Sequence, residues 1–558
     1  MSDAKTSNLS VSKATALRPI IDVAADLGLS PDDLYLYGPH MAKVTSPPDA
    51  DAPQGQLVLV SAINPTPAGE GKTTTSVGLT QALSKAGTKA CIALREPSLG
   101  PVFGIKGGGC GGGHSQVLPM EEINLHFTGD LHAITSAHNL LSAMIDNELH
   151  FRTRELDLEY RDIQWPRVMD MNDRSLRQVT IGLGGRLQGV PREDRFDITA
   201  ASEVMAILAL AADLEDLEQR LGNIMVGHNH KMEPVYARDL QAQGAMTMLL
   251  RQALLPNLVQ TVEGVPAFVH AGPFANIAHG CNSVIATKTA LGLADVVVTE
   301  AGFGFDLGAE KFINIKCRTA GLFPDAIVLV ATTKALKMHG GVPKKQLKGR
   351  NDDALRAGLS NIDRHIATAR GLGINPVVSI NHFADDSQEE MQIIVDHCRS
   401  QNVACAVSRF FSEGGAGGLE LAGLVQEALK HGPSEASFTY ELQDSVETKI
   451  EKIVQKVYGG DGVTFTKQAR KHLREIKALG YTHLPVCMAK TQYSLSDDQR
   501  LVGRPEGFTV GVRELRLNSG SGFIVAMTGN IMSMPGLPRR PAACEMGLDD
   551  DGKPVGMF

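Results

Sequence analysis

The chain has 558 residues, of which 43% are hydrophobic and 21% are charged, which gives room for about three domains and argues against disorder as the dominant state. Its net charge of −8 excludes a global basic field of the kind that holds nucleic acid. The apolar runs are far shorter than the roughly 20 residues of a membrane span, and the polar stretch Met1–Thr15 has no apolar signal core, so we expect a cytoplasmic protein without a membrane partner. The eight cysteines are scattered and form no CxxC pair, which indicates reduced thiols rather than a zinc site.

The first half of the chain alternates predicted strands and helices. A short helical pattern and a polar connector precede the first strand, whose residues are almost all apolar, as in a strand buried on both faces. A helix follows, with Gly87 at its end, and then a second apolar strand. In chain order these elements are the helix Ile20–Leu29, the connector Ser46–Gln54, the strand Leu57–Ala62, the helix Thr73–Ala86 and the strand Lys89–Leu94.

Further apolar runs of the same type predict more strands, with helices such as Ile198–Leu214 between them. Strands that alternate with helices imply a mainly parallel α/β sheet. The pattern changes near Asn361–Ala369, becomes mixed from Gly459 onward and ends in a tail rich in Gly and Pro, Asn518–Pro541. The additional strands are predicted at Val179–Leu183, Ala267–His270, Asp295–Thr299, Ala326–Ala331 and Asn375–Ile380.

The strongest local signal is a candidate phosphate-binding loop between the first strand and its helix. Gly69 and Gly71 let backbone N–H groups turn toward phosphate oxygens, Lys72 reaches the β- and γ-phosphates, and the Thr73 hydroxyl ligates Mg²⁺. The alternative is a Gly-rich turn with a stray lysine, which the flanking strand and helix disfavour. We therefore predict that ATP is bound by Thr66, Pro67, Ala68, Gly69, Glu70, Gly71, Lys72 and Thr73.

Two further segments are unusual. Arg95 directly follows the second strand, where α/β proteins form ligand sites, and its planar guanidinium suits a carboxylate or phosphate; a surface arginine is equally compatible with the residues alone. The segment Gly107–Gly113 contains six glycines, which allows very close packing against a ligand or another backbone, although a flexible linker is the simpler alternative. A basic stretch begins at Lys334; its part Lys344–Arg350 is interpreted as a solvated face, while the part around His339–Gly341 is also compatible with an anion path.

Taken together, these motifs resemble the formate–tetrahydrofolate ligase (formyltetrahydrofolate synthetase) family, and the resemblance covers nearly the whole chain. It rests on TPAGEGKTTT at Thr66–Thr75, REPSLGPVFGIKGGGCGGG at Arg95–Gly113, INLHFTGD at Ile123–Asp130, HAGPFANIAHGCNSVIATK at His270–Lys288, EAGFGFDLGAEKF at Glu300–Phe312, KALKMHGG at Lys334–Gly341, AKTQYSLSDD at Ala489–Asp498 and MPGLPRRPAA at Met534–Ala543. The sequence departs from the family pattern at several positions. The family usually has tryptophan in place of Phe411, arginine in place of Lys334 and alanine in place of Phe305, and its glycine loop commonly reads GGAAGGGY, which differs here at Gly109–Cys110 and His114.

The resemblance implies an ADP-forming ligase that joins formate to N10 of tetrahydrofolate through formyl phosphate. It implies an α/β fold: a P-loop NTPase-like domain with a mainly parallel sheet at residues 1–362, a small α/β domain at residues 363–458 that contributes to the folate site, and a C-terminal domain at residues 459–558. We expect a monofunctional homotetramer that uses ATP with Mg²⁺, a monovalent cation (K⁺ or NH₄⁺), formate and polyglutamylated tetrahydrofolate.

The resemblance also assigns roles to individual residues. Lys72 and Arg95 are the expected catalytic residues, with Arg95 stabilising formyl phosphate. Glu96 is expected at the monovalent-cation site. The flat pterin of the folate is expected to stack on aromatic rings at Phe303, Phe383 and Phe411.

Two other classes of protein are weighed against the ligase. A switch ATPase of the partitioning type would use the same phosphate loop, but it leaves the Arg95 segment and the distal motifs unexplained. A non-enzymatic nucleotide- or folate-binding scaffold would not need Lys72, Thr73 and Arg95 together.

Overall fold

The computed structural model describes residues 8–46, 54–104, 108–529 and 531–557. The connector predicted at Ser46–Gln54 therefore lies almost wholly outside the described residues, as does Gly107 of the glycine segment. No helix of the described residues is both long enough and apolar enough to cross a membrane.

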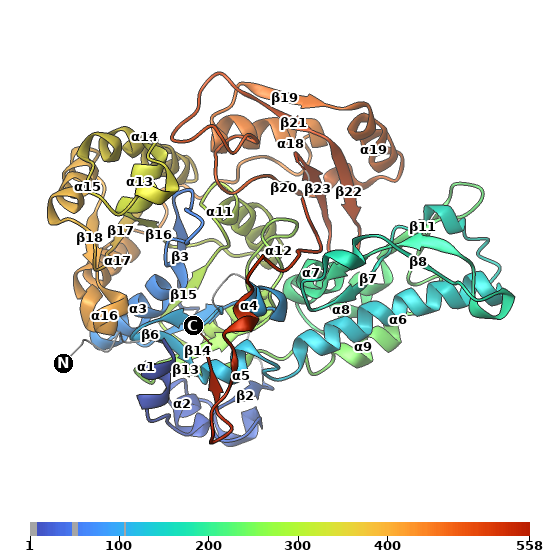
Figure 1. Cartoon of the computed structure of the whole chain (residues 1–558), viewed down its shortest axis with the longest axis horizontal. Coiled ribbons are helices and arrows are strands. Elements are labelled where there is room, and N and C mark those ends of the chain that lie inside the picture. The colour runs from blue at the N-terminus through green and yellow to red at the C-terminus, as the bar shows by residue number, and fades with distance from the viewer. Residues whose placement is uncertain (1–7, 47–53, 105–107, 530, 558) are drawn as a thin grey trace.

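A 12-stranded, mostly parallel sheet forms the centre of a mixed α/β fold (Figure 1). Ten of its strands follow the order β1-β2-β13-β14-β4-β15-β3-β16-β17-β18, and the other two, β5 (Gly111–Gly112) and β6 (Ser115–Leu118), attach beside β13. The seven strands from β14 to the end of this order are parallel, whereas β1, β2 and β13 form an antiparallel edge. The parallel strands are β3 (Gln56–Ala62), β4 (Ala90–Leu94), β14 (Pro266–Val269), β15 (Val296–Glu300), β16 (Ala326–Ala331), β17 (Val377–Asn381) and β18 (Cys405–Ser408); the edge strands are β1 (Leu34–Leu36), β2 (Ala42–Val44) and β13 (Asn257–Thr261).

The central strands are buried on both faces, as their continuous apolar sequences predict. In β3, Leu57 and Leu59 join the core on one face, while Val58 and Val60 join the core on the other. One core is completed by α10 (Val284–Leu293), α13 (Thr333–His339), α14 (Asp352–Gly371) and α15 (Gln388–Ser400), and the other by α3 (Lys72–Lys85) and α17 (Leu419–His431).

The predicted strands of this sheet are confirmed at 57–62, 89–94, 267–270, 295–299, 326–331 and 375–380, within a few residues at each end. A strand forms where Val179–Leu183 was predicted, but its expected place in the main parallel sheet is wrong. Val179–Ile181 (β8) instead pairs antiparallel with Arg192–Asp194 (β9) in a separate hairpin, whose connecting loop begins at Gly182 with φ +72°.

This hairpin belongs to a helical arm that projects from one end of the sheet (Figure 1). The arm has its own apolar core and contains α6 (Asp130–Phe151), α7 (Glu203–Leu210), α8 (Leu214–Gly222), α9 (Gln243–Leu250) and the strands β11 (Met225–His228) and β12 (Pro234–Tyr236). The helix predicted at Ile198–Leu214 is shorter than expected. Ser202 caps α7 by accepting a bond from the N–H of Val204, and the extended backbone at Ala211 ends it.

The C-terminal part of the chain builds a second core around a smaller sheet. There β20 (Val486–Ala489) runs parallel to β23 (Phe523–Met527), which also pairs with β22 (Glu514–Asn518). The segment 518–541, predicted as a tail, thus contains the buried central strand of this sheet. The apolar run of this strand was not predicted as a strand because Gly and Pro residues surround it. Two strands from the region after residue 362, β17 and β18, continue the main sheet.

Candidate active site

The segment Thr66–Thr73 forms a turn between β3 and α3, at the carboxyl edge of the parallel strands. Gly69 and Gly71 both take left-handed backbone conformations, with φ of +83° and +72°. A Cβ on Gly71 would stand only 2.3 Å from Nδ2 of Asn381 at the end of β17. The sequence therefore needs glycine here, and the turn leaves Lys72 and Thr73 at the first positions of α3.

Glu70 closes this turn from within. Its buried carboxylate accepts a hydrogen bond from the backbone N–H of Thr66 (2.7 Å) and another from the hydroxyl of Thr332 at the end of β16. Its carbonyl accepts a bond from Asn381 (3.0 Å). Glu70 thus ties the loop to two neighbouring strands, while Pro67, Ala68 and Gly69 stay exposed.

Thr73 faces a carboxylate that sequence reasoning did not select. Its hydroxyl donates to the two carboxylate oxygens of Glu300, at 3.1 and 3.0 Å. Glu300 is the last residue of β15, which lies beside β3 in the sheet, and it is 7% exposed. A signal existed in the sequence: an acidic residue that directly follows a buried parallel strand must emerge at the same edge as the phosphate loop.

Arg95 also reaches this edge, at the end of β4 on the other side of β15. Its Nη1 donates to the carbonyl of Pro273 (3.3 Å), and its buried Nε–H has no hydrogen-bond partner. Glu96 is 4% exposed, and its Oε2 is likewise unpartnered. Burial, followed by the negative charge of Asp130, raises the pKa of Glu96 well above its usual range.

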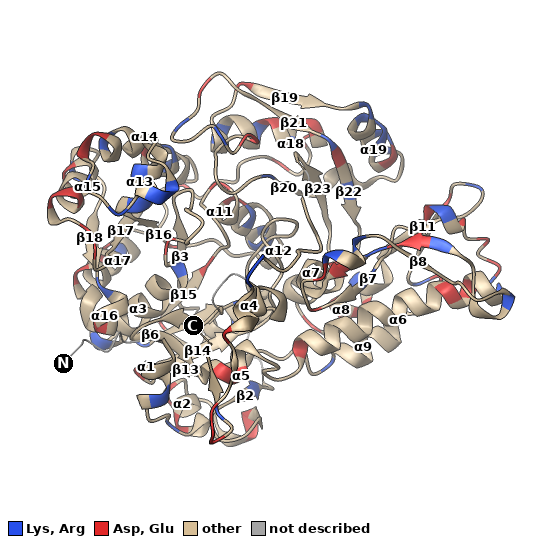
Figure 2. Ribbon diagram, viewed as in Figure 1, with Lys and Arg blue, Asp and Glu red and all other residues tan. Residues whose placement is uncertain are grey.

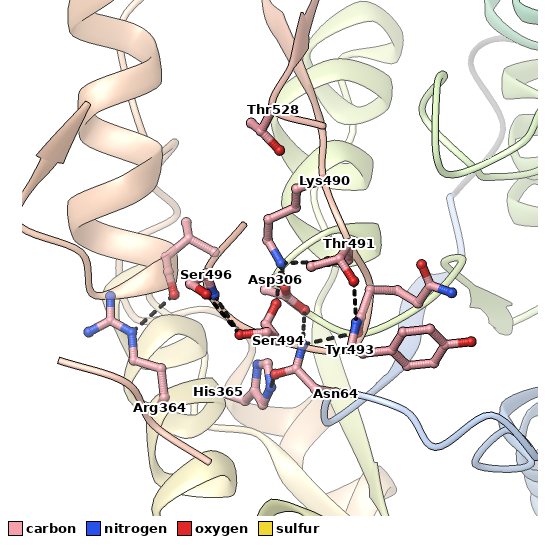
Figure 3. A network of polar contacts seen from close by, with 12 residues as sticks. Asn64, Asp306, Arg364, His365, Lys490, Thr491, Tyr493, Ser494, Ser496 and Thr528 are labelled. Atoms are coloured by element: carbon pink, nitrogen blue, oxygen red, sulfur yellow. Dashed lines mark hydrogen bonds and ion pairs between the residues drawn. The ribbon is translucent and has the colours of Figure 1, made fainter. Parts of the chain in front are cut away.

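A buried polar network lies at the start of the turn Thr66–Thr73 (Figure 3). Asn64 lies two residues after β3; its Nδ2 donates to Oδ1 of Asp306 (3.1 Å), and its Oδ1 accepts from Asn361 (3.0 Å) and His365 (3.1 Å). Asp306 in turn forms a fully buried ion pair with Lys490, at 2.6 Å. Because Lys490 directly follows β20, the C-terminal part of the chain is tied through Asp306 to Asn64, just before the turn Thr66–Thr73.

His339 strengthens the same connection. Its Nδ1 accepts from the N–H of Gly503, so the proton lies on Nε2, which donates to the carbonyl of Asn64 (2.9 Å). Burial lowers the pKa of His339 and lowers that of His365 to about 4. Both rings are therefore neutral near pH 7, and the backbone and side chain of Asn64 are fixed together.

The three aromatic residues predicted for a pterin follow three different strands, and none of their rings stacks on another. Phe303 lies just beyond β15 and has φ +60°, a conformation unusual for a bulky residue. Phe383 lies beyond β17, half-buried, with Nζ of Lys334 4.3 Å from its ring centre. Lys334 also pairs with Asp385 at 2.7 Å. α13, which carries Lys334, and the turn after it are visibly basic (Figure 2).

Phe411 lies beyond β18 in α16 (Phe410–Glu413) and is 45% exposed. The glycine segment packs directly on it: a Cβ on Gly113 would stand 2.0 Å from the carbonyl oxygen of Phe411, which accepts a bond from the N–H of His114 (2.9 Å). Gly111–Gly112 forms a short strand, β5, paired with β6 (Ser115–Leu118). The described part of this segment is thus a close-packed element rather than a linker.

The structure therefore brings Lys72, Thr73, Arg95 and Phe303 to one edge of the sheet, on the loops after β3, β4 and β15. Phe383 follows the neighbouring strand β17, whereas Phe411 sits against the glycine segment. Phe305, one of the departures from the family pattern, is fully buried in the core, so that substitution changes packing rather than an open surface.

These features define an α/β protein whose candidate site gathers a glycine turn, cationic side chains and a carboxylate at the carboxyl edge of parallel strands. Comparison with known proteins is more specific. The family model of formate–tetrahydrofolate ligase matches residues 6–558. A formate–tetrahydrofolate ligase of Bacillus pumilus (strain SAFR-032) is 55% identical over 555 residues, and one of Arthrobacter sp. (strain FB24) is 56% identical over 560 residues; each alignment covers 99% of both chains. The chain belongs to the formate–tetrahydrofolate ligase family.

Proposed function

We propose that this protein joins formate to tetrahydrofolate with consumption of ATP, giving 10-formyltetrahydrofolate, ADP and phosphate. The family match over nearly the whole chain supports the overall reaction. The observation that carries the proposal for the site is the strand–turn–helix at Thr66–Thr73, with Glu300 placed against Thr73. It supports a phosphate-binding loop of the P-loop NTPase type.

The proposed chemistry has two steps. An oxygen of formate forms a bond to the γ-phosphorus of ATP, while the bond from that phosphorus to the bridging oxygen breaks and ADP leaves with the electron pair. N10 of tetrahydrofolate then forms a bond to the formyl carbon, the bond from that carbon to the phosphate oxygen breaks, inorganic phosphate leaves, and the proton of N10 passes to solvent. No enzyme nucleophile is required, because positioning and charge stabilisation suffice.

The residues divide these tasks. The turn Thr66–Thr73 offers backbone N–H groups to phosphate oxygens, and Lys72 neutralises charge on the transferred phosphoryl group. Thr73 and Glu300 form an oxygen pair that would hold Mg²⁺, directly or through water, and the ion would neutralise charge on ATP. Arg95 holds the oxygens of formate and formyl phosphate with its planar guanidinium.

We assign the pterin to the aromatic residues Phe303, Phe383 and Phe411. The left-handed backbone of Phe303 supports this assignment, because such strain, of order 1–3 kcal/mol, is concentrated at functional sites. The exposed Lys344, Lys345 and Lys348 follow the helix that carries Lys334, and they suit the carboxylates of a glutamate or polyglutamate tail.

Glu96 is the proposed ligand of a monovalent cation. Its buried, unpartnered Oε2 fits that role, because a bound cation would supply the missing partner. We further propose cytoplasmic location, a homotetramer and domain boundaries near residues 362 and 458, as the family resemblance implies. A switch ATPase of the partitioning type gains no support from the comparisons, whose matched residues 6–558 include the distal motifs.

The proposal is tested by a substrate-omission assay. Purified protein is incubated with ATP, Mg²⁺, K⁺, formate and tetrahydrofolate, and the acidified product is measured as methenyltetrahydrofolate absorbance. Product that requires all three substrates is expected. ATP hydrolysis that proceeds without formate and tetrahydrofolate would favour the switch ATPase instead.

A further inference from the structure

The segment Pro273–Asn282 receives three cationic side chains from other parts of the chain. Arg95 donates to the carbonyl at the start of the segment (3.3 Å). Lys311 donates to two carbonyls in its middle, at 2.5 and 3.4 Å. Lys316 donates to the side-chain oxygen of Asn282 at its end (2.7 Å). One short loop therefore collects positive charge from β4, from α11 (Gly308–Lys311) and from the π-helical segment Phe312–Cys317.

Among the described residues no carboxylate forms an ion pair with Arg95, Lys311 or Lys316. The nearest buried carboxylate in the chain is Glu310, beside Lys311, and burial raises its pKa to about 7. Lys311 and Lys316 are both fully buried, and their hydrogen-bond acceptors are neutral carbonyl, amide and hydroxyl oxygens. Burial of an unpaired charge is costly, so buried charges in proteins normally have an ionic partner. The fold therefore buries two ammonium groups near Arg95, and a bound anion would balance their charge.

His279 lies in the middle of the segment and is fully buried, yet neither of its ring nitrogens has a hydrogen-bond partner. Burial, and then the charges of Lys316, Lys311 and Arg95, hold its pKa well below the usual value, so the ring is neutral and offers one N–H donor. Buried polar groups are rarely left unpaired. By contrast, both nitrogens of buried His138 in the helical arm are bonded, to Ser202 and to the carbonyl of Pro166.

Two further donors are buried without a partner on or beside the segment, Nε–H of Arg95 and Nδ2 of Asn282. The unpartnered acceptors are Oδ1 of Asn276 within the segment and Oε2 of Glu96 and of Glu310 at its flanks. A carboxylate only accepts hydrogen bonds, so a set of free donors among cations matches it.

Two glycines bring the segment close to Arg95. The N–H of Gly302 donates to the carbonyl of Gly280 (3.0 Å), which joins the segment to the loop after β15. A Cβ on Gly302 would stand 3.3 Å from both terminal nitrogens of Arg95 and 2.5 Å from Cβ of Ala275. The guanidinium of Arg95 and the segment Pro273–Asn282 are thus adjacent, and no side chain at Gly302 separates them.

We propose that His279 is part of a buried subsite for the carboxylate of formate. The subsite lies next to Arg95, on the segment that Lys311 and Lys316 also contact. This inference rests on the proposed function, because formate is the small monoanion of that reaction. One carboxylate supplies the negative charge that the buried lysines lack and accepts from the free donors of His279 and Arg95. The phosphate groups of ATP are assigned to the turn at Lys72, where backbone N–H groups are available.

The test uses His279→Gln and His279→Leu in the full-length protein, with KM and kcat measured separately for formate and for ATP. The subsite predicts at least about a tenfold loss of kcat/KM for formate, the effect of a missing hydrogen bond to a charged group, with KM for ATP changed less than about twofold. His138→Gln is the matched control: it removes a buried histidine with two bonds, so it lowers the melting temperature without a change in KM for formate.

A binding measurement that does not need turnover accompanies the kinetics. Formate is expected to raise the melting temperature of the wild-type protein more than equimolar acetate, whose methyl group does not fit a one-carbon subsite, and this difference is lost in His279→Gln.

Normal formate kinetics in a folded His279 variant would overturn the inference, as would a preserved formate-dependent stabilisation. A rise in KM for ATP equal to that for formate would overturn it in favour of a phosphate site. If the wild-type protein itself makes no formate-dependent product, the proposed function fails, which is a separate outcome. If neither variant folds, the absence of a formate-specific melting shift in the wild type overturns the subsite, and its presence supports it.

Discussion

Nζ of Lys490 lies 2.6 Å from Oδ2 of Asp306, and both side chains are completely buried. The pair joins the residue after strand β20 of the C-terminal sheet to the loop after β15. Asp306 also accepts a hydrogen bond from Asn64, which lies just before the turn Thr66–Thr73 (Figure 3). The motif Ala489–Asp498 is far from the turn Thr66–Thr73 in sequence. The contacts of Lys490 show that this motif helps to hold the residues before that turn.

Lys490→Met should lower the free energy of unfolding by about 3–5 kcal/mol, because it leaves the Asp306 carboxylate buried without its partner. Lys452→Met is the control. Lys452 pairs with Asp444 at the same distance, 2.6 Å, but the two side chains are 32% and 20% exposed, so the loss should stay below about 1 kcal/mol. Chemical denaturation of both variants measures the difference, and equal losses would contradict the role given to burial.

Lys72→Ala should reduce ligation by about 10²–10³-fold or more while the melting temperature changes little, because Lys72 stands at the start of α3 where phosphate charge would be stabilised. Lys85→Ala, at the exposed far end of the same helix, is the matched control and should retain activity. Unchanged turnover in the Lys72 variant would defeat the assignment of the phosphate loop.

Glu300→Gln should raise the Mg²⁺ concentration needed for half-maximal activity, because it removes the charge that faces the Thr73 hydroxyl. The amide keeps the size of the side chain, so the fold should be retained. Titration of activity with Mg²⁺ at saturating ATP measures the effect. An unaltered Mg²⁺ requirement would mean that Glu300 only orients Thr73.

Phe411→Ala should raise KM for tetrahydrofolate much more than KM for ATP, because the half-exposed ring is free to stack on a pterin while its backbone supports the glycine segment. Leu419→Ala is a control at a nearby position of similar exposure, 48%. A proportionate rise in KM for ATP would argue against stacking.

Acid should destabilise the fold between about pH 6.5 and pH 4. Burial lowers the pKa of His138 to about 3 and the pKa values of His270 and His365 to about 4, so the unfolded chain binds protons in this range that the folded chain does not. Each histidine then contributes a loss of about 1.4 kcal/mol per pH unit, and the contribution is fully present only above pH ~6.5. His138→Gln should be less stable at pH 7 but lose about 2 kcal/mol less than wild type between pH 6.5 and 5; an identical pH dependence would contradict the neutral, buried state of His138.

The sequence alone was sufficient to predict features that depend on a short, continuous stretch of chain. The turn at Thr66–Thr73 was predictable because an apolar strand, two glycines and a helix start are contiguous. By contrast, Glu300 was missed because its contact with Thr73 joins the end of β15 to the helix that follows β3, and these two strands are neighbours in the sheet but distant in the chain.

Other errors have similar causes. Val179–Ile181 has the composition of a buried strand, yet it lies in a hairpin whose connecting loop, residues 182–191, contains several glycines with positive φ. The cation cluster around His279 could not be read from the chain either, since Lys311 and Lys316 look like ordinary helix residues until packing buries them.

The most direct test of the central claim follows the oxygen atoms of formate. The enzyme is given formate labelled with ¹⁸O at both oxygens, together with ATP, Mg²⁺ and tetrahydrofolate, and the inorganic phosphate is analysed by mass spectrometry. Because a formate oxygen bonds to the γ-phosphorus and the C–O bond then breaks, one ¹⁸O per turnover should appear in phosphate and the other in the formyl group. Unlabelled phosphate, formed at the same rate as 10-formyltetrahydrofolate, would contradict phosphoryl transfer to formate.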